Sequence, residues 1–323
     1  MHSIEQLQNL VNKAIADTKY TEKPAELYEP ITYLMQLGGK RMRPVLVLVS
    51  TELFGGNILK ALDAAIGIEL FHNFTLMHDD IMDKAPLRRG KPTVHAKWNE
   101  SAAILSGDVM FVEAYKHMIK VDDCILREVL AVFSDTASGV CQGQQADINF
   151  EKRDDVSLTE YLEMIRQKTA VLLAGSMQIG ALIGGATQEH AKLLYEFGEN
   201  LGLAFQLQDD ILDVYGNPEK FGKQVGGDIL SNKKTFMLIK AKELVKGNTS
   251  SELDQWLKRS DNPLAKVDAI TSIYNLLEVR KLAEIEMEKY VDKALKALDL
   301  VSVDSPNKEL LRGFAEQLLI REH

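Results

Sequence analysis

Apolar residues recur every three or four positions along most of this chain, which is the spacing of one face of a helix. The beginning of the chain shows it clearly, with apolar side chains at Ile4, Leu7, Val11, Ala14 and Ile15. No series of short alternating strands interrupts the spacing, and the chain has only eight prolines and no low-complexity linker. We therefore predict an all-α protein in which residues 1–323 form a single domain.

Clusters of glycine and proline separate the predicted helices, among them GGKRMRP, KAPLRRGKP and YGNPEKFGKQVGGD. The run VLVLV at residues 45–49 has a second interpretation, as a buried strand. Because the run continues into a longer segment with helical spacing, we predict a helix there as well.

The composition of the chain limits its possible binding partners and its cellular location. The chain carries 47 acidic and 38 basic residues, a formal charge of -9, which argues against a nucleic acid or an anionic membrane surface as the main partner. Its two cysteines, Cys124 and Cys141, are too few for a disulfide framework and lack metal-ligand spacing. The first residues lack the pattern of a signal peptide, and no apolar run approaches membrane-spanning length. We therefore expect a cytoplasmic protein without an integral membrane segment.

Three aspartates stand close together in HDDIMD, within a mainly apolar stretch. On a helix, Asp79 and Asp83 would share one face about 6 Å apart, with Asp80 turned about 100° away. Carboxylates this close repel one another, and in apolar surroundings they need cations. A charged helix end that faces water is the alternative interpretation of this motif taken alone.

The same DDxxD spacing recurs at Asp209, Asp210 and Asp213, again in a mainly apolar helix. Two such triads that face each other across a helix bundle would suit Mg²⁺, which prefers a few carboxylates together with water and phosphate oxygens. A di-iron site would need two ExxH motifs, and Glu69 with His72 supplies one. We therefore favour magnesium and a phosphorylated ligand.

Basic residues accompany the first motif. Pro86 is expected to stop its helix, and the following loop can turn Arg88 and Arg89 back toward a bound anion. A turn at the start of another helix carries the basic residues Lys40, Arg41 and Arg43. Cations and free N–H groups together make an anion site there, although a solvated basic turn is the alternative.

A glycine-rich loop follows the second motif. It contains the basic residues Lys223, Lys233 and Lys234 beside Asp228. Glycines permit hinge-like backbone angles, so this loop suits a lid that closes over a magnesium diphosphate and excludes water.

In this order the segments resemble the trans-isoprenyl diphosphate synthases, the all-helical head-to-tail prenyltransferases. The resemblance spans nearly the whole chain and rests on GGKRMRP, ELFHNFTLMHDDIMDKAPLRRGKPTVH, KTAVLLAGS and FQLQDDILDVYGNPEKFGKQVGGDILSNKKT. It implies the isoprenoid synthase fold, a single large helical bundle around a central cavity, and a homodimer. It also implies that isopentenyl diphosphate condenses with an allylic diphosphate, which would be dimethylallyl, geranyl or farnesyl diphosphate.

The resemblance further implies a role for each matching residue. Three Mg²⁺ ions on the allylic diphosphate would be held by Asp79, Asp83 and Asp209, with support from Asp80, Asp210 and Asp213. The same diphosphate would be clamped by Arg88, Lys168, Lys223 and Lys233. Isopentenyl diphosphate would be bound by Lys40, Arg43, His72 and Arg89. The allylic cation would be stabilised by Lys168, Thr169 and Gln206, and the departing diphosphate would take the proton.

Taken without the resemblance, some of these residues have simpler interpretations. His72 would be a hydrogen-bonded core histidine, and Lys168 with Thr169 would be an ordinary helix surface. Many relatives end in a basic tail that closes over isopentenyl diphosphate. This chain ends in Arg321, Glu322 and His323, of which Arg321 is the residue that would serve.

Product length in this family depends on side chains about one turn before the first triad. Phe74 lies five residues before Asp79, about 7.5 Å along the helix, and Thr75 beside it is small. One bulky residue there, with no insertion in DDIMD, resembles the geranylgeranyl diphosphate (C20) pattern. Farnesyl diphosphate (C15) and a longer polyprenyl diphosphate are the alternatives, and Phe74 is also compatible with a purely core position.

Other functional classes match parts of the pattern. The non-catalytic small subunit of heteromeric synthases is a helical partner, but it lacks intact triads, and this chain keeps both. Class I terpene cyclases ionise the same substrates but carry an Asn/Asp, Ser/Thr, Glu metal triad in place of the second DDxxD. A plain helical scaffold would not place carboxylates among apolar residues twice, because their burial is costly.

Overall fold

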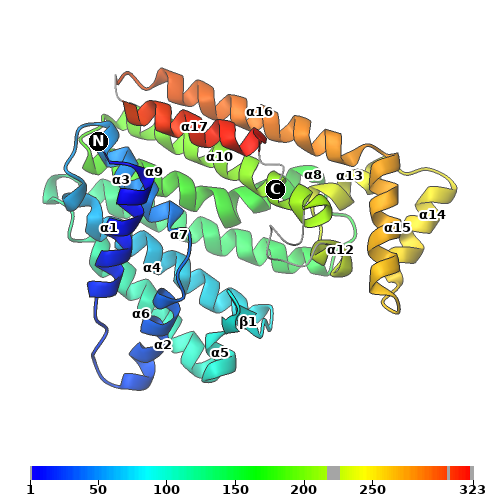
Figure 1. Cartoon of the computed structure of the whole chain (residues 1–323), viewed down its shortest axis with the longest axis horizontal. Helices are drawn as coiled ribbons and strands as arrows, with labels where there is room; N and C mark the ends of the chain where they lie inside the picture. The colour runs from blue at the N-terminus through cyan, green and yellow to red at the C-terminus, as the bar shows by residue number, and fades with distance from the viewer. Residues whose placement is uncertain (1, 217–225, 304–305, 321–323) are drawn as a thin grey trace. The chain divides into compact units, whose positions relative to one another are not determined.

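Helices make up nearly all the regular structure of the computed structural model, which describes residues 2–216, 226–303 and 306–320, with side chains as far as residue 316 (Figure 1). Within these ranges the only strands are the two-residue β1 (Leu87–Arg88) and β2 (Lys91–Pro92), which pair antiparallel. The prediction of an all-α protein is therefore confirmed. None of the helices in the described ranges is both long enough and apolar enough to cross a membrane.

The chain divides into two compact units, of which the first comprises Met1–Ala137, Gly175–Tyr195 and Ser302–Lys308. Its helices are α1 (Ile4–Asp17), α2 (Ala25–Gln36), α3 (Met42–Leu53), α4 (Ile58–Met82), α5 (Val94–Lys97), α6 (Glu100–Met118), the first part of α7 (Asp123–Glu151), the second part of α9 (Val171–Ile183), the first part of α10 (Gln188–Tyr215) and the start of α17 (Pro306–Ile320). The predicted helix at residues 45–49 is confirmed, because these residues form the middle of α3 and all five are buried. The predicted first helix is confirmed as α1, which begins with a capping box of Ser3 and Gln6.

Helix α4 is apolar on nearly every side, and other helices surround it. It packs against α1, α2, α3, α5 and α6. Its side chains Ile68, Leu70 and Phe71 are fully buried in this core. The packing leaves the carboxyl end of α4, which carries the first aspartate motif, at the edge of the apolar core.

The second unit comprises Ser138–Ala174, Glu196–Val301 and Glu309–His323. Its helices are the rest of α7, α8 (Leu158–Ile165), the π-helix η1 (Arg166–Ala170), the first part of α9 (Val171–Ile183), the second part of α10 (Gln188–Tyr215), α12 (Gly227–Leu230), α13 (Phe236–Leu244), α14 (Asn248–Lys258), α15 (Pro263–Leu276), α16 (Val279–Leu300) and most of α17 (Pro306–Ile320). Helix α13 packs against α8, α15 and α16. The second aspartate motif lies near the carboxyl end of α10.

Helix α4 ends before the proline that was expected to stop it. Its last helical residue is Met82, and the left-handed Lys84 (φ 50°) turns the chain out of the helix ahead of Pro86. The hairpin of β1 and β2 follows. Its two-residue turn has positive φ at both Arg89 (53°) and Gly90 (74°), as a type I′ turn requires. This tight turn reverses the chain and directs it back toward α4.

Candidate functional site

The first aspartate motif divides into one buried and two more accessible carboxylates. Asp80 is 3% exposed, whereas Asp79 is half-buried and Asp83 is exposed at the end of α4. The Asp83 N–H donates to the Asp79 carbonyl oxygen at 2.8 Å, so the helical turn continues through the motif. The predicted spacing is therefore present, and Asp79 and Asp83 are the pair that a ligand can reach.

Arg88 of the hairpin holds the buried Asp80. Its Nε donates to Asp80 Oδ2 and its Nη2 to Asp80 Oδ1, each at 2.8 Å. This is the bidentate geometry in which guanidinium and carboxylate bind most strongly. Arg88 thus turns back toward the first motif, as expected, although its partner in this structure is a protein carboxylate.

The second motif repeats this arrangement within the second unit. Asp210 is 3% exposed, while Asp209 and Asp213 are half-buried. The Tyr161 hydroxyl and the Phe236 backbone N–H both donate to Asp210 Oδ2, the latter at 3.0 Å. Burial raises the pKa of Asp210 to about 7, against the opposing effect of the Tyr161 hydrogen bond. In both motifs, then, the middle aspartate is bound by other groups of the protein.

Asp213 anchors the short helix α12. Its Oδ2 accepts the Asp228 N–H at 2.9 Å, and its carbonyl oxygen accepts the Gly226 N–H at 2.6 Å. The Lys233 N–H in turn donates to the Asp228 carbonyl oxygen at 2.9 Å. This chain of contacts connects the second motif to Lys233, while the predicted lid residue Lys223 lies outside the described residues.

The carboxylates suit a hard divalent cation that keeps part of its water. Among the residues that the structure describes, no three His, Cys, Asp or Glu side chains form a group able to hold a metal. Mg²⁺ does not require such a group, because one or two carboxylates with waters and phosphate oxygens are its usual ligands. Two pairs of this kind are present, Asp79 with Asp83 and Asp209 with Asp213, each four residues apart and not fully buried.

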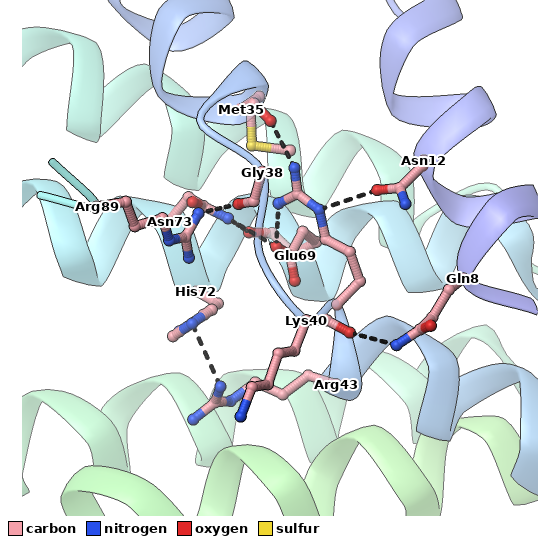
Figure 2. Close-up of polar contacts among 11 residues, drawn as sticks. Gln8, Asn12, Met35, Gly38, Lys40, Arg43, Glu69, His72, Asn73 and Arg89 are labelled. Carbon is pink, nitrogen blue, oxygen red and sulfur yellow. Dashed lines mark hydrogen bonds and ion pairs between the residues drawn. The ribbon is translucent and has the colours of Figure 1, made fainter. Parts of the chain in front are cut away.

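The basic turn before α3 brings positive charge against His72 of α4 (Figure 2). Arg43 Nη1 lies 3.2 Å from His72 Nε2, and since arginine can only donate, Nε2 accepts and the imidazole is neutral. Burial, followed by the charges of Arg43, Arg89, Arg88 and Arg41, holds the pKa of His72 well below 6.5. Arg43 Nε is buried and has no hydrogen-bond partner within the described part of the chain. Donors and positive charge therefore gather here, as an anion site requires.

Arg89 reaches the same cluster from the hairpin. It donates from Nη1 to the Gly38 carbonyl oxygen, and a Cβ on Gly39 would lie only 3.0 Å from its guanidinium. Burial and the charge of Arg41 lower the pKa of Arg89. The exposed Lys40 extends in the same direction as Arg43 (Figure 2). The structure thus brings together the residues predicted for isopentenyl diphosphate, which are Lys40, Arg43, His72 and Arg89.

Lys168 lies in the π-helix η1, a form often found at functional sites. Its Nζ donates to Asp147 Oδ2 of α7 at 2.6 Å. Gly143 makes room for the wider turn, because a Cβ there would lie 2.2 Å from the Lys168 backbone nitrogen. Thr169 donates to Gln206 Oε1 at 3.3 Å, and Gln206 lies on α10 one turn before the second motif. The predicted group of Lys168, Thr169 and Gln206 therefore lies beside that motif.

Phe74 belongs to an aromatic cluster in the first unit. It is 8% exposed and stacks on Phe111 of α6, with ring centroids 5.1 Å apart and planes 7° apart. The rings of Phe71 and His78 lie 5.5 and 4.7 Å from it. Thr75 is half-buried, and its hydroxyl donates to the backbone of the preceding turn. Phe74 is therefore a core aromatic, and its role in product length stays a prediction.

The structure also shows partners that the sequence did not predict. Tyr161 and Asp147 lie 49 and 21 residues from Asp210 and Lys168, and no local pattern joins such distant residues. Glu69 was considered only as half of an ExxH motif, yet it forms a buried ion pair with Arg41. A signal for Glu69 was present, because a carboxylate inside the apolar run AAIGIELF needs a buried cation.

Comparison with known proteins gives consistent results. The family model described as polyprenyl synthetase matches residues 24–277. A geranylgeranyl diphosphate synthase of Methanosarcina mazei is 39% identical over 316 residues, covering 97% of this chain and 95% of that protein. A crystal structure of a geranylgeranyl pyrophosphate synthase has a TM-score of 0.95 and 42% identity, with both chains covered completely. A polyprenyl synthase from Caulobacter crescentus, complexed with calcium and isoprenyl diphosphate, has a TM-score of 0.87 and 28% identity, covering 99% and 98% of the chains.

Proposed function

Because the chain belongs to the polyprenyl synthetase family, we propose that it condenses isopentenyl diphosphate head to tail with an allylic diphosphate. Its enzyme class is that of the isoprenyl diphosphate synthases, which are prenyltransferases. The observation that carries the proposal is the cluster around His72, where the Nε of Arg43 is buried without a partner in the described residues beside a neutral imidazole. Such donors match the oxygens of a diphosphate.

Each substrate has its own set of residues in this proposal. Isopentenyl diphosphate is bound by Lys40, Arg43, His72 and Arg89. The allylic diphosphate, from dimethylallyl, geranyl or farnesyl diphosphate, is clamped by Arg88, Lys168, Lys223 and Lys233. The family depends on magnesium, and three Mg²⁺ ions are held by Asp79, Asp83 and Asp209 with Asp213 in support. Asp80 and Asp210 support the site indirectly, by orienting Arg88 and the start of α13.

The reaction begins when the C–O bond of the allylic diphosphate breaks and the electron pair leaves with the diphosphate. Bound Mg²⁺ would supply electrostatic stabilisation of that leaving group. Arg88, Lys168 and Lys233 place further positive charge at its oxygens. The double bond of isopentenyl diphosphate attacks the allylic carbon, and a new C–C bond forms. The resulting carbocation loses a proton to the departing diphosphate, and the product is five carbons longer.

The side chains near the second motif protect the cationic intermediate. The oxygens of Thr169 and Gln206 lie 3.3 Å apart and form a hydrogen bond. Both oxygens stabilise the positive charge of the cation without acting as nucleophiles. Exclusion of water from the site prevents its capture of the cation.

The product we propose is geranylgeranyl diphosphate, with farnesyl diphosphate or a longer polyprenyl diphosphate as alternatives. Phe74 ends the channel in which the product grows, and its stacking on Phe111 holds the ring in place. The names of the similar proteins, a geranylgeranyl diphosphate synthase among them, support this length.

We further propose that residues 1–323 act as one catalytic domain in a cytoplasmic homodimer. Helix α6 supports the dimer, because it exposes the large apolar side chains Ile104, Leu105, Val112 and, just after its end, Ile119. Exposed apolar residues that line one helix are typical of an interface between subunits. The molar mass in solution, from light scattering, tests this part of the proposal.

The experiment that tests the function is an incubation of purified protein with Mg²⁺, isopentenyl diphosphate and each allylic diphosphate in turn. Mass spectrometry of the products should show a dominant C20 diphosphate. C15 or longer products would keep the enzyme and discard the assigned length. Folded protein that condenses none of the starters would overturn the proposal, and conversion of an allylic diphosphate to a hydrocarbon without isopentenyl diphosphate would identify a cyclase.

A further inference from the structure

Arg41 is buried in the basic turn, between two residues assigned to isopentenyl diphosphate. It is 5% exposed, and its Nη1 lies 2.5 Å from an oxygen of Glu69, which is 3% exposed. Its Nη2 donates to the Met35 carbonyl oxygen at 2.6 Å, and its Nε to Asn12 Oδ1 at 3.3 Å. One guanidinium therefore connects α1, the end of α2 and α4.

The backbone of Arg41 adopts an unusual conformation for this residue. Its φ of 48° and ψ of 34° lie in the left-handed region, which is energetically unfavourable for a residue with a Cβ. The three hydrogen bonds of the side chain offset that cost. They hold Arg41 inward, while Lys40 before it is exposed and Arg43 after it reaches His72.

Glu69 is oriented from its own helix. Asn73 Nδ2 donates to Glu69 Oε1 at 3.0 Å and to the Glu69 carbonyl oxygen at 2.8 Å. Glu69 lies three residues before His72 on α4, so the two side chains share one side of the helix. The ion pair therefore sets the distance between the basic turn and α4 at the level of His72.

We infer that Arg41 and Glu69 are positioning residues of the isopentenyl diphosphate site, which they shape without touching the substrate. This inference rests on the proposed function. A buried ion pair adds little net stability, because the loss of water around both charges cancels much of their attraction. Its contribution here is geometric, since it holds Arg43 Nη1 at 3.2 Å from His72 Nε2. Loss of the pair weakens binding of isopentenyl diphosphate and leaves binding of the allylic diphosphate unchanged.

The test compares steady-state constants for both substrates in four variants. Arg41→Lys and Glu69→Gln weaken the hydrogen bonds between the two side chains and keep side chains of similar length. Arg41→Met and the double variant Arg41→Met with Glu69→Leu remove the charges. The exposed Arg259, which pairs with Asp261 in the second unit, supplies the control variant Arg259→Met. We expect the KM for isopentenyl diphosphate to rise by about 10- to 100-fold in the four variants, with the allylic KM unchanged.

The double variant separates positioning from stability. An apolar pair of similar volume restores the thermal unfolding midpoint that Arg41→Met loses, because no charge is left unpaired. The KM for isopentenyl diphosphate should nevertheless stay high. A double variant with the wild-type KM would overturn the inference, and if that variant does not fold, a wild-type KM in Arg41→Lys overturns it instead. Absence of condensation by the wild type would overturn the proposed function as well.

Discussion

Arg88 donates two hydrogen bonds of 2.8 Å to Asp80, and through them the hairpin after α4 is fastened back onto that helix. Asp210 has a comparable structural part in the second unit, where it accepts hydrogen bonds from Tyr161 and from the start of α13. The middle aspartate of each DDxxD motif therefore binds protein groups. The outer aspartates of both motifs are more accessible to solvent than the middle ones.

Substitution of Asp79 and of Asp80 should have different effects. Asp79→Asn should lower kcat by about 100- to 1,000-fold, because an anionic metal ligand is lost while the helix is kept. Asp80→Asn should lower the free energy of unfolding by about 1–3 kcal/mol, because Arg88 loses a charged acceptor. Turnover and denaturant unfolding measure the two effects, with Asp254→Asn on the exposed face of α14 as control. Near-normal turnover of Asp79→Asn would contradict its assignment as a metal ligand.

Removal of the metal should abolish condensation. Chelation by EDTA is expected to stop the reaction, and added Mg²⁺ to restore it. Since Mg²⁺ prefers a few carboxylates together with phosphate oxygens, Mg²⁺ and inorganic pyrophosphate together should raise the thermal unfolding midpoint more than either alone. Scanning fluorimetry measures the unfolding midpoint with Mg²⁺ alone, with pyrophosphate alone and with the two together. Additive shifts would show that the two ligands bind independently, against the proposal.

Phe74→Ala should lengthen the product, because removal of the ring that stacks on Phe111 opens space beyond it. The loss of a buried ring also costs about 3–5 kcal/mol of stability, so the milder Phe74→Leu is a useful companion. Phe54→Ala is the matched control, since Phe54 stacks on His190 and lies outside this aromatic cluster. Product lengths are measured by mass spectrometry. An unchanged distribution in Phe74→Ala would remove Phe74 from the floor of the channel.

Two histidines, His72 and His117, should make the fold sensitive to acid. Burial lowers the pKa of His72 and, together with Lys120, that of His117, so both imidazoles are held neutral in the fold. Below about pH 6.5 the unfolded chain binds protons that the folded chain does not. Their contribution to stability is therefore complete above that pH and is lost as the pH falls, by up to about 1.4 kcal/mol per pH unit for each group.

The measurement is denaturant unfolding of the wild type, His72→Gln and His117→Gln between pH 5 and pH 8. Asp210, whose pKa is raised to about 7, acts with the opposite sign over this range. The comparison of each variant with the wild type removes that common contribution. Each substitution should reduce the loss of stability on acidification. Parallel pH curves for a variant and the wild type would exclude that histidine as a source.

Gly143 should be essential to the π-helix that carries Lys168. A Cβ on Gly143 would lie 2.2 Å from the Lys168 backbone nitrogen, and such overpacking costs about 1–3 kcal/mol. Alanine gains about 1 kcal/mol in helix propensity, which does not offset it. Gly139→Ala on the same helix is the control, because its Cβ would meet Val171 at an ordinary 3.4 Å. Gly143→Ala should lose stability and raise the KM for the allylic substrate, whereas Gly139→Ala should do neither.

The helices could be predicted from the sequence because each buries a periodic apolar face. Residues 45–49 became part of α3 for this reason, although the run alone also matched a strand. The hairpin of β1 and β2 was missed, since its two-residue strands are too short to produce a pattern. The stop of α4 was placed at Pro86, but the left-handed Lys84 ends the helix sooner.

The candidate site was predictable in its chemistry. Repeated DDxxD motifs, the basic turn and the glycine-rich loop predicted which residue types would serve a magnesium diphosphate, because charges among apolar residues need partners of opposite sign. Which carboxylates remain accessible was not predictable. Asp79 and Asp80 are neighbours in the sequence, yet one is half-buried and the other is bound by Arg88.

The sequence by itself determined the helical class, the family and the set of residues proposed to carry the chemistry. Only the tertiary structure decided that Asp80 and Asp210 face inward, that Glu69 pairs with Arg41, and that Gly143 admits a π-turn at Lys168. The physical reason is distance along the chain. Periodicity and motif spacing are local, whereas a buried charge is satisfied by whichever partner the packing brings within about 3 Å, from 8 to 49 residues away in these cases.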